Sequence, residues 1–172
     1  MSKILFFFFI VLFSLKTSIS YSDNIRDFTI EGMSIGDSTL DFFSKKEILN
    51  NKMDYYKKDD FITIGFNNHP SLNQYDWLQI TYKKNNRKYL VESLDGVLAF
   101  RDDYSGCLKK KSQIALEIKD MTGVEPDELG GKHRADPTGK TIFSNSEFNV
   151  DNDFIVISCI DWSKKMEEIY FC

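Results

Sequence analysis

The chain has 172 residues, of which 42% are hydrophobic and 15% aromatic, and its formal net charge is −4. A disordered segment would be much poorer in apolar and aromatic residues, so the composition indicates a folded protein. A net negative charge repels phosphate backbones, so we expect no nucleic acid among its partners.

The N-terminus has the order of a secretory signal peptide. Residues 1–3 form a short, positively charged stretch. An almost unbroken apolar run follows over residues 4–15, and small polar residues then extend to Ser20. The run is about twelve residues long, whereas a helix needs roughly 20 to cross a bilayer. We therefore predict a signal peptide over residues 1–20 and no stable membrane span after its removal. Cleavage after Ser22 and a retained anchor are the alternatives.

Removal of this segment would leave about 152 residues, the ordinary size of one domain. Without Lys3 and Lys16 the chain has 20 basic and 26 acidic side chains, a formal charge of −6. It has only three prolines and no tract rich in serine and glycine, so the sequence indicates no interdomain linker. We predict a single globular domain over residues 21–172, located in the periplasm or secreted.

The first part of this domain is predicted to be a short strand followed by helix. Residues 28–30 read as the strand. Residues 34–37 are predicted to start a helix, because serine and aspartate side chains accept the free N–H groups of a first turn. Apolar residues between 40 and 49 predict one broken helix or two short ones, and residues 55–60 a polar connection.

Alternating apolar and polar residues then predict a series of strands. They cover residues 61–66, 77–82, 88–94 and 97–100, with a tight turn or bulge at Asp95-Gly96. Short turns between alternating strands favour antiparallel pairing with one wetter face.

Residues 104–121 carry the clearest helical pattern, and Gly123 is a natural stop. Lys111 interrupts the apolar face of this helix, but the run of lysines at 109–111 is predicted to be its solvated side. The apolar residues that share one face are Tyr104, Cys107, Ile114, Ile118 and Met121.

After this helix we predict a loop, a hairpin and a short helix. The loop covers residues 124–139, the hairpin strands 141–150 and 154–160, and the helix begins at Ser163. Asp151-Asn152-Asp153 starts like a calcium loop, but valine and tryptophan stand where that motif needs glycine and glutamate. We therefore interpret it as the hairpin tip.

The order of helices and strands predicts an α+β protein, with an antiparallel sheet of about five to six strands and two or three helices packed on it. Residues 76–80 and 153–157 loosely resemble each other, and each stretch follows a helix and another strand. A duplicated helix-plus-hairpin unit is one interpretation of this similarity.

Two serines are the only candidates for a nucleophile. Gly32 to Gly36 matches G-x-S-x-G around Ser34, and Gly36-Asp37-Ser38 resembles the Gly-Asp-Ser block of the SGNH esterases. Those enzymes take their base from Asp-x-x-His, and neither His69 nor His133 has aspartate at that offset. We favour helix capping by Asp37 and Ser38, with a small serine hydrolase as the alternative.

No other pattern indicates chemistry, so we predict no catalytic residues, no metal and no cofactor. The two histidines have no cysteine or histidine at metal-ligand spacing. Gly139-Lys140-Thr141 ends like a phosphate loop but has Arg134 where the first glycine is required. His133 with Arg134 and Asp136 is the one polar cluster that remains of interest.

Cys107 and Cys159 are predicted to form a disulfide. Export places a chain where disulfides persist, and each cysteine lies on an apolar face, Cys107 of the helix and Cys159 of a strand. The competing interpretation is two small buried thiols. Cys172, at the end of the chain, is left over.

Four stretches of the chain form a recognisable set: residues 28–38, Tyr75-Asp76, the run from Cys107 to Lys111, and residues 158–164. Together they resemble a group of short exported proteins of AT-rich marine alphaproteobacteria such as the SAR11 group. The resemblance implies a Gram-negative periplasmic setting and no particular chemistry. It also implies that such chains continue into a further strand and helix, so that this one is truncated and has an unprotected sheet edge.

Gly32-Met33-Ser34 also resembles the turn that opens the first helix in BamE (SmpA)-type envelope domains, which are interaction modules. We therefore expect a non-catalytic periplasmic binding or interaction module. Its partner would be an unknown envelope protein or a small ligand.

Overall fold

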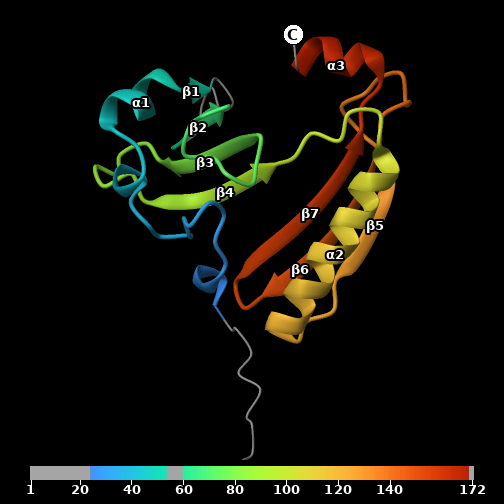
Figure 1. Ribbon diagram of the computed structural model, residues 1–172, viewed down its shortest axis with the longest axis horizontal. Helices are drawn as coiled ribbons and strands as arrows, with labels where there is room; N and C mark the ends of the chain where they lie inside the picture. Colours follow the sequence, from blue (N-terminus) through green and yellow to red (C-terminus); the bar gives the residue numbers. More distant parts are fainter. Residues whose placement is uncertain (1–23, 54–59, 171–172) are drawn as a thin grey trace, which may run out of the picture.

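The computed structural model describes residues 24–53 and 60–170, which form two halves, each with its own antiparallel sheet (Figure 1). One sheet has the strand order β1-β2-β3-β4 and the other β5-β6-β7. The predicted α+β class is confirmed, but the expected single sheet of five to six strands is wrong. The predicted signal peptide and most of the predicted connection at 55–60 lie outside the described residues.

The first half contains two single-turn 3-10 helices, one short α-helix and four strands. In chain order these are η1 (Ile25–Asp27), η2 (Thr39–Asp41), α1 (Lys45–Asn50), β1 (Lys52–Met53), β2 (Phe61–Asn67), β3 (Trp77–Lys83) and β4 (Val91–Val97). The second half contains α2 (Tyr104–Thr122), β5 (Asp127–Lys132), β6 (Ile142–Val150), β7 (Asp153–Asp161) and α3 (Lys164–Tyr170).

A reciprocal cap starts α1. The Ser44 hydroxyl accepts from the Glu47 N–H, and the Glu47 carboxylate accepts from the Ser44 N–H at 2.8 Å. The helix places Ile48, which is fully buried, against the sheet. The rest of the buried cluster in this half is Met33, Phe43, Ile64, Phe66, Leu78, Ile80, Tyr82 and Val91.

The turn or bulge expected at Asp95-Gly96 is wrong, because both residues lie inside β4 and pair regularly with β3, whose register shifts at Thr81 and Tyr82 instead. Gly96 is required there for close packing: a Cβ on it would come within 2.7 Å of the Tyr75 ring. Glycine in a strand can mark such a close approach as well as a turn, and the sequence does not distinguish the two.

The N-terminal segment forms neither the predicted strand nor the predicted helix start. Ile30 makes only an isolated bridge to Met33, and residues 34–37 form a turn. The helical turn that follows residues 34–37 is η2, with Ser38 as its N-cap. Phe28 packs against the buried cluster of the second half, so this segment touches both halves.

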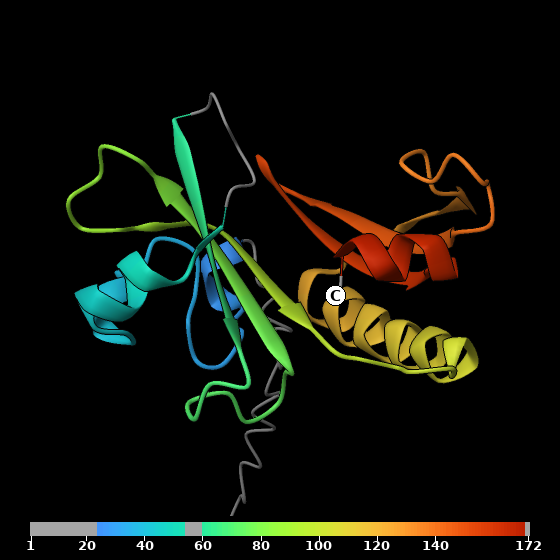
Figure 2. The ribbon, with the colours of Figure 1, turned by 90° about the horizontal axis from the view of Figure 1, so that it is seen from above.

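The predicted long helix is confirmed as α2. Asp103 accepts the Gly106 N–H at its start, and Gly123 ends it with a positive φ of 70°. Figures 1 and 2 show α2 along one face of the β5-β6-β7 sheet, and no helix of the described part of the chain covers the other face. The cluster between them contains Ala115, Ile118, Phe148 and Val150.

The loop expected at 124–139 is wrong in part, because it contains β5. Gly130 pairs with Ser144 in the centre of its ladder with β6. Every residue of this edge strand is exposed, so it lacks the alternation that a half-buried strand shows. Its two adjacent glycines are also a pattern that is typical of turns, so the sequence indicates a loop here.

A helix followed by an antiparallel meander occurs twice, as α1-β1-β2-β3 and as α2-β5-β6-β7. The two similar sequence stretches enter β3 and β7, the third strand after the helix in each case. This order agrees with the predicted repetition and extends it by one strand. That the two halves form one domain stays a prediction.

Candidate functional site

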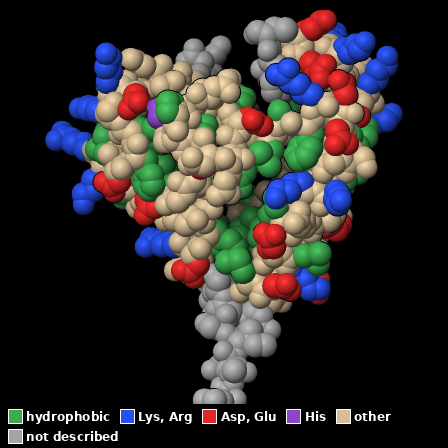
Figure 3. Space-filling view, viewed as in Figure 1, with side chains coloured by type: hydrophobic (Ala, Val, Ile, Leu, Met, Phe, Trp, Pro, Cys, Tyr) green, Lys and Arg blue, Asp and Glu red, His purple; other side chains and the backbone are tan. Residues whose placement is uncertain are grey.

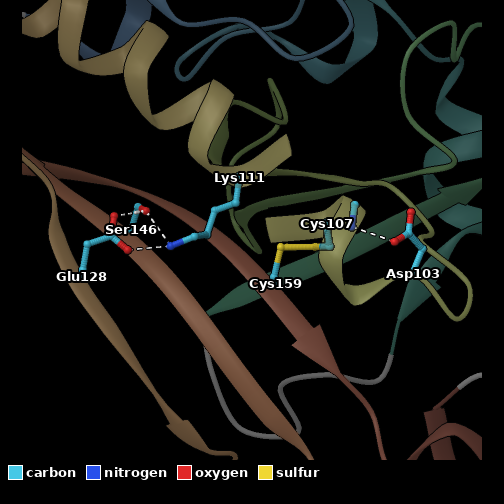
Figure 4. Close-up of a disulfide and its surroundings, with 7 residues drawn as sticks. Asp103, Cys107, Lys111, Glu128, Ser146 and Cys159 are labelled. Atoms are coloured by element: carbon cyan, nitrogen blue, oxygen red, sulfur yellow. Dashed lines mark hydrogen bonds and ion pairs between the residues drawn. A yellow bond between two sulfur atoms is a disulfide. The ribbon is translucent and has the colours of Figure 1, made fainter. Parts of the chain in front are cut away.

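The predicted disulfide between Cys107 and Cys159 is present and joins α2 to β7 (Figure 4). The two Cα atoms are 5.9 Å apart, within the normal range for a bridge. Cys159 is 1% exposed, so the bond lies inside the second half. Disulfides of this kind persist in oxidising compartments. Cys172 lies outside the described residues.

Lys111 lies one helical turn from Cys107 on the same side of α2 (Figure 4). Its ammonium donates to Glu128 Oε2 at 2.6 Å and to Ser146 Oγ at 2.9 Å, and Ser146 donates to Glu128 Oε1. Lys111 is only 6% exposed, so the prediction of a solvated lysine run is wrong for this residue. Lys109 is exposed.

This cluster binds three elements together. Hydrogen bonds from Lys111, then from Ser146, lower the pKa of the Glu128 carboxyl. The carboxylate therefore stays charged opposite the ammonium ion. Each of the three groups has its partner within the cluster, so we interpret it as a tie between α2, β5 and β6.

The two candidate serines have their hydroxyl groups occupied. The Ser34 hydroxyl lies 2.6 Å from the Arg26 carbonyl and 2.9 Å from that of Phe28. The Ser38 hydroxyl donates to the Lys88 carbonyl at 2.8 Å and caps η2. A nucleophilic serine needs its proton directed at a base, and these protons point at main-chain carbonyls.

A different serine lies beside a histidine. Ser71 Oγ is 2.5 Å from His69 Nδ1, and His69 Nε2 is 3.2 Å from Glu47 Oε1. Nδ1 also accepts the Ser71 N–H, so it is the unprotonated nitrogen and Nε2 donates to the carboxylate. Local sequence patterns do not reveal this series of hydrogen bonds, because Glu47 and His69 lie 22 residues apart in different elements.

This histidine lies in a surface pocket of about 350 Å³ formed by Asn68, His69 and residues 72–76. The N–H groups of residues 73–75 all donate to one oxygen of Glu31, at 2.6 to 3.0 Å. Burial alone would raise the pKa of Glu31, but these hydrogen bonds outweigh burial and lower it. These N–H groups could otherwise stabilise an oxyanion, but they already donate to Glu31. Their hydrogen bonds connect the N-terminal segment to the β2–β3 loop.

Glu47 is expected to make the first half sensitive to acid. Hydrogen bonds from Ser44, then from His69, lower its pKa from 4.5 to about 2. A lowered pKa stabilises the fold above pH 4.5, and this contribution is lost as pH falls toward 2. Urea denaturation at a series of pH values should therefore give a shallower loss of stability for Glu47→Gln than for wild type in this window. Glu168→Gln, at an exposed position of α3, is the control and should follow wild type. Equal slopes for all three would contradict the prediction.

The polar cluster expected around His133 does not form one site. Asp136 points inward and is buried, and it accepts the N–H and hydroxyl groups of Thr138 and Thr141. Burial would raise the pKa of Asp136, but these bonds outweigh it and lower the pKa. His133 packs its ring against Phe143 and Trp162, and Arg134 is exposed. Asp136 thus holds the turn that leads into β6.

β7 has an open edge and an apolar outer face. Among the residues that the structure describes it pairs only with β6, and it is the strand of its sheet nearest the first half (Figure 1). Figure 3 shows a hollow between the two halves, bordered by hydrophobic side chains. On the face away from α2, Phe154 is 71% and Val156 40% exposed. Side chains of this size are unusual at such exposure on a free strand edge.

Within residues 24–53 and 60–170, no helix has the length and apolar character that a membrane crossing requires. The same residues contain no group of three or more His, Cys, Asp or Glu side chains placed to hold a metal ion. Comparisons with family models, curated proteins and solved structures found no match to this chain.

Proposed function

We propose that the protein is a non-catalytic binding or interaction module of the periplasm or the secreted fraction, and that β7 is its binding surface. The observation that carries this proposal is the contrast between β7 and the other three sheet edges of the described residues. Proteins normally protect such edges with charges, proline, bulges, shortness or a covering segment.

The other edges all have such protection. β1 has two residues, and β5 carries charged residues and two glycines. The start of β4 bonds to Gly36 and Asp37 of the N-terminal segment, and the rest carries acidic residues. β7 has nine residues, and between its first and last there is no charge, proline or glycine.

Two further observations support the proposal. The disulfide and the signal-like N-terminus agree with a location outside the cytoplasm. The hydroxyl groups of Ser34 and Ser38 donate to carbonyls, and Glu31 occupies the N–H donors beside His69. These contacts favour binding over the serine hydrolase alternative.

The experiment is selection of random extended peptides on the mature, disulfide-bonded protein. Wild type and Leu116→Lys should enrich the same peptides, because Leu116 is 60% exposed on α2, away from β7. Val156→Lys should lose them while keeping the wild-type unfolding midpoint. The proposal fails if no peptide is enriched or if the Val156 variant retains the set.

A further inference from the structure

Both ends of β7 carry a negatively charged side chain. Asp153 and Asp161 are its first and last residues, and both are exposed. The two aspartates are eight residues apart on β7. In the ladder with β6, Asp153 pairs with Val150 and Asp161 with Ile142. Because strand side chains alternate, both carboxylates lie on the α2 side of the sheet. The seven residues between them carry no charge.

The opposite side of β7 is apolar near its start. Phe154, Val156, Ser158 and Ile160 alternate with the residues that face α2, and the first two are the most exposed apolar side chains on the strand. An added strand would place its own alternate side chains beside these residues. Apolar residues fit there, and charged ones do not.

A second copy of this chain is a poor match for the edge. Antiparallel pairing of β7 with β7 in full register would place Asp153 of each copy opposite Asp161 of the other. Like charges directly opposite each other destabilise a strand pair. The acidic ends therefore favour a strand whose ends are basic.

We propose that β7 binds, by antiparallel strand addition, an extended segment of a partner protein with lysine or arginine at two positions eight residues apart. The residues between are uncharged and favour strands. This proposal rests on the proposed function. Main-chain hydrogen bonds supply the affinity, and the two ion pairs set the register.

The test uses a nine-residue peptide with lysine at both ends and alternating valine and threonine between, matched in length to β7. Its control has glutamate at both ends. The mature, disulfide-bonded protein should bind the lysine peptide about tenfold more tightly, because two opposite-charge pairs replace two like-charge pairs. The Asp153→Lys/Asp161→Lys variant should reverse this preference. Equal affinities, or no reversal, would overturn the proposal.

Strand addition has a second signature in the peptide backbone. Only alternate N–H groups of an added strand point at its neighbour. Methylation of one alternate set of peptide nitrogens should abolish binding, and methylation of the other set should leave it. Equal effects of the two would overturn strand addition.

Two outcomes distinguish failure of this proposal from failure of the proposed function. Selected peptides that bind at Val156 but lack basic ends would leave the proposed function standing and refute the charge rule. A concentration-dependent dimer, seen by light scattering and lost in Val156→Lys, would show a second copy as the occupant and overturn the choice of partner.

Discussion

Loss of the bond between Cys107 and Cys159 is expected to lower the free energy of unfolding by about 4 kcal/mol. The bridge closes a loop with a sequence separation of 52, and the chain-entropy relation gives this value for a loop of that length. Small domains are stable by only about 5–15 kcal/mol, so the reduced protein should be close to unfolding at 37 °C.

Urea denaturation of the oxidised protein and of Cys107→Ala/Cys159→Ala measures the difference. Cys172→Ser is the matched control, because it removes a cysteine and leaves the bridge. It should unfold at the wild-type midpoint. A difference below about 1 kcal/mol between wild type and the double variant would show that the bridge constrains the unfolded chain little.

Removal of Glu128 is expected to destabilise the protein more than replacement of Lys111 does. Glu128→Ala leaves the buried ammonium of Lys111 with Ser146 as its remaining partner. Breaking a buried ion pair on one side costs roughly 3–5 kcal/mol. Because the Glu128 side chain is 57% exposed, we expect a smaller loss of about 2 kcal/mol.

Lys111→Met removes the charge and keeps most of the volume, so its cost should be below about 1 kcal/mol. The double variant should resemble Lys111→Met, because no buried cation remains for Glu128 to compensate. Denaturation of the two single variants and the double variant gives the coupling energy directly. Additive effects would mean that the ion pair contributes nothing beyond its separate side chains.

The sequence predicted those features that depend on local periodicity. It placed Cys107 on the packed face of α2 and Cys159 on the inner face of β7, and their pairing followed from export and apolar surroundings. The extent of α2 followed from the apolar spacing over residues 104–121, and its end from Gly123. Local spacing contains this information because a helix has a fixed repeat.

Features that depend on pairing between distant segments could not be predicted in the same way. Alternation identified β2, β3, β6 and β7 but not which strands share a sheet, so the division into two sheets between β4 and β5 was missed. Lys111 was assigned to solvent because its partners lie 17 and 35 residues away. The contact between His69 and Glu47 likewise depends on how the β2–β3 loop folds back on α1.

The disulfide also changes how the chain would respond to force. A pull on the two ends would pass from Cys107 directly to Cys159, so the rest of α2, all of β5 and β6 and most of β7 would carry no tension. About 180 Å of contour length, at roughly 3.5 Å per residue, would stay out of reach. Unravelling would be confined to the residues outside this loop, which are the first half, the start of α2, the end of β7 and the C-terminal helix. Most of the strand with the open edge would remain mechanically shielded.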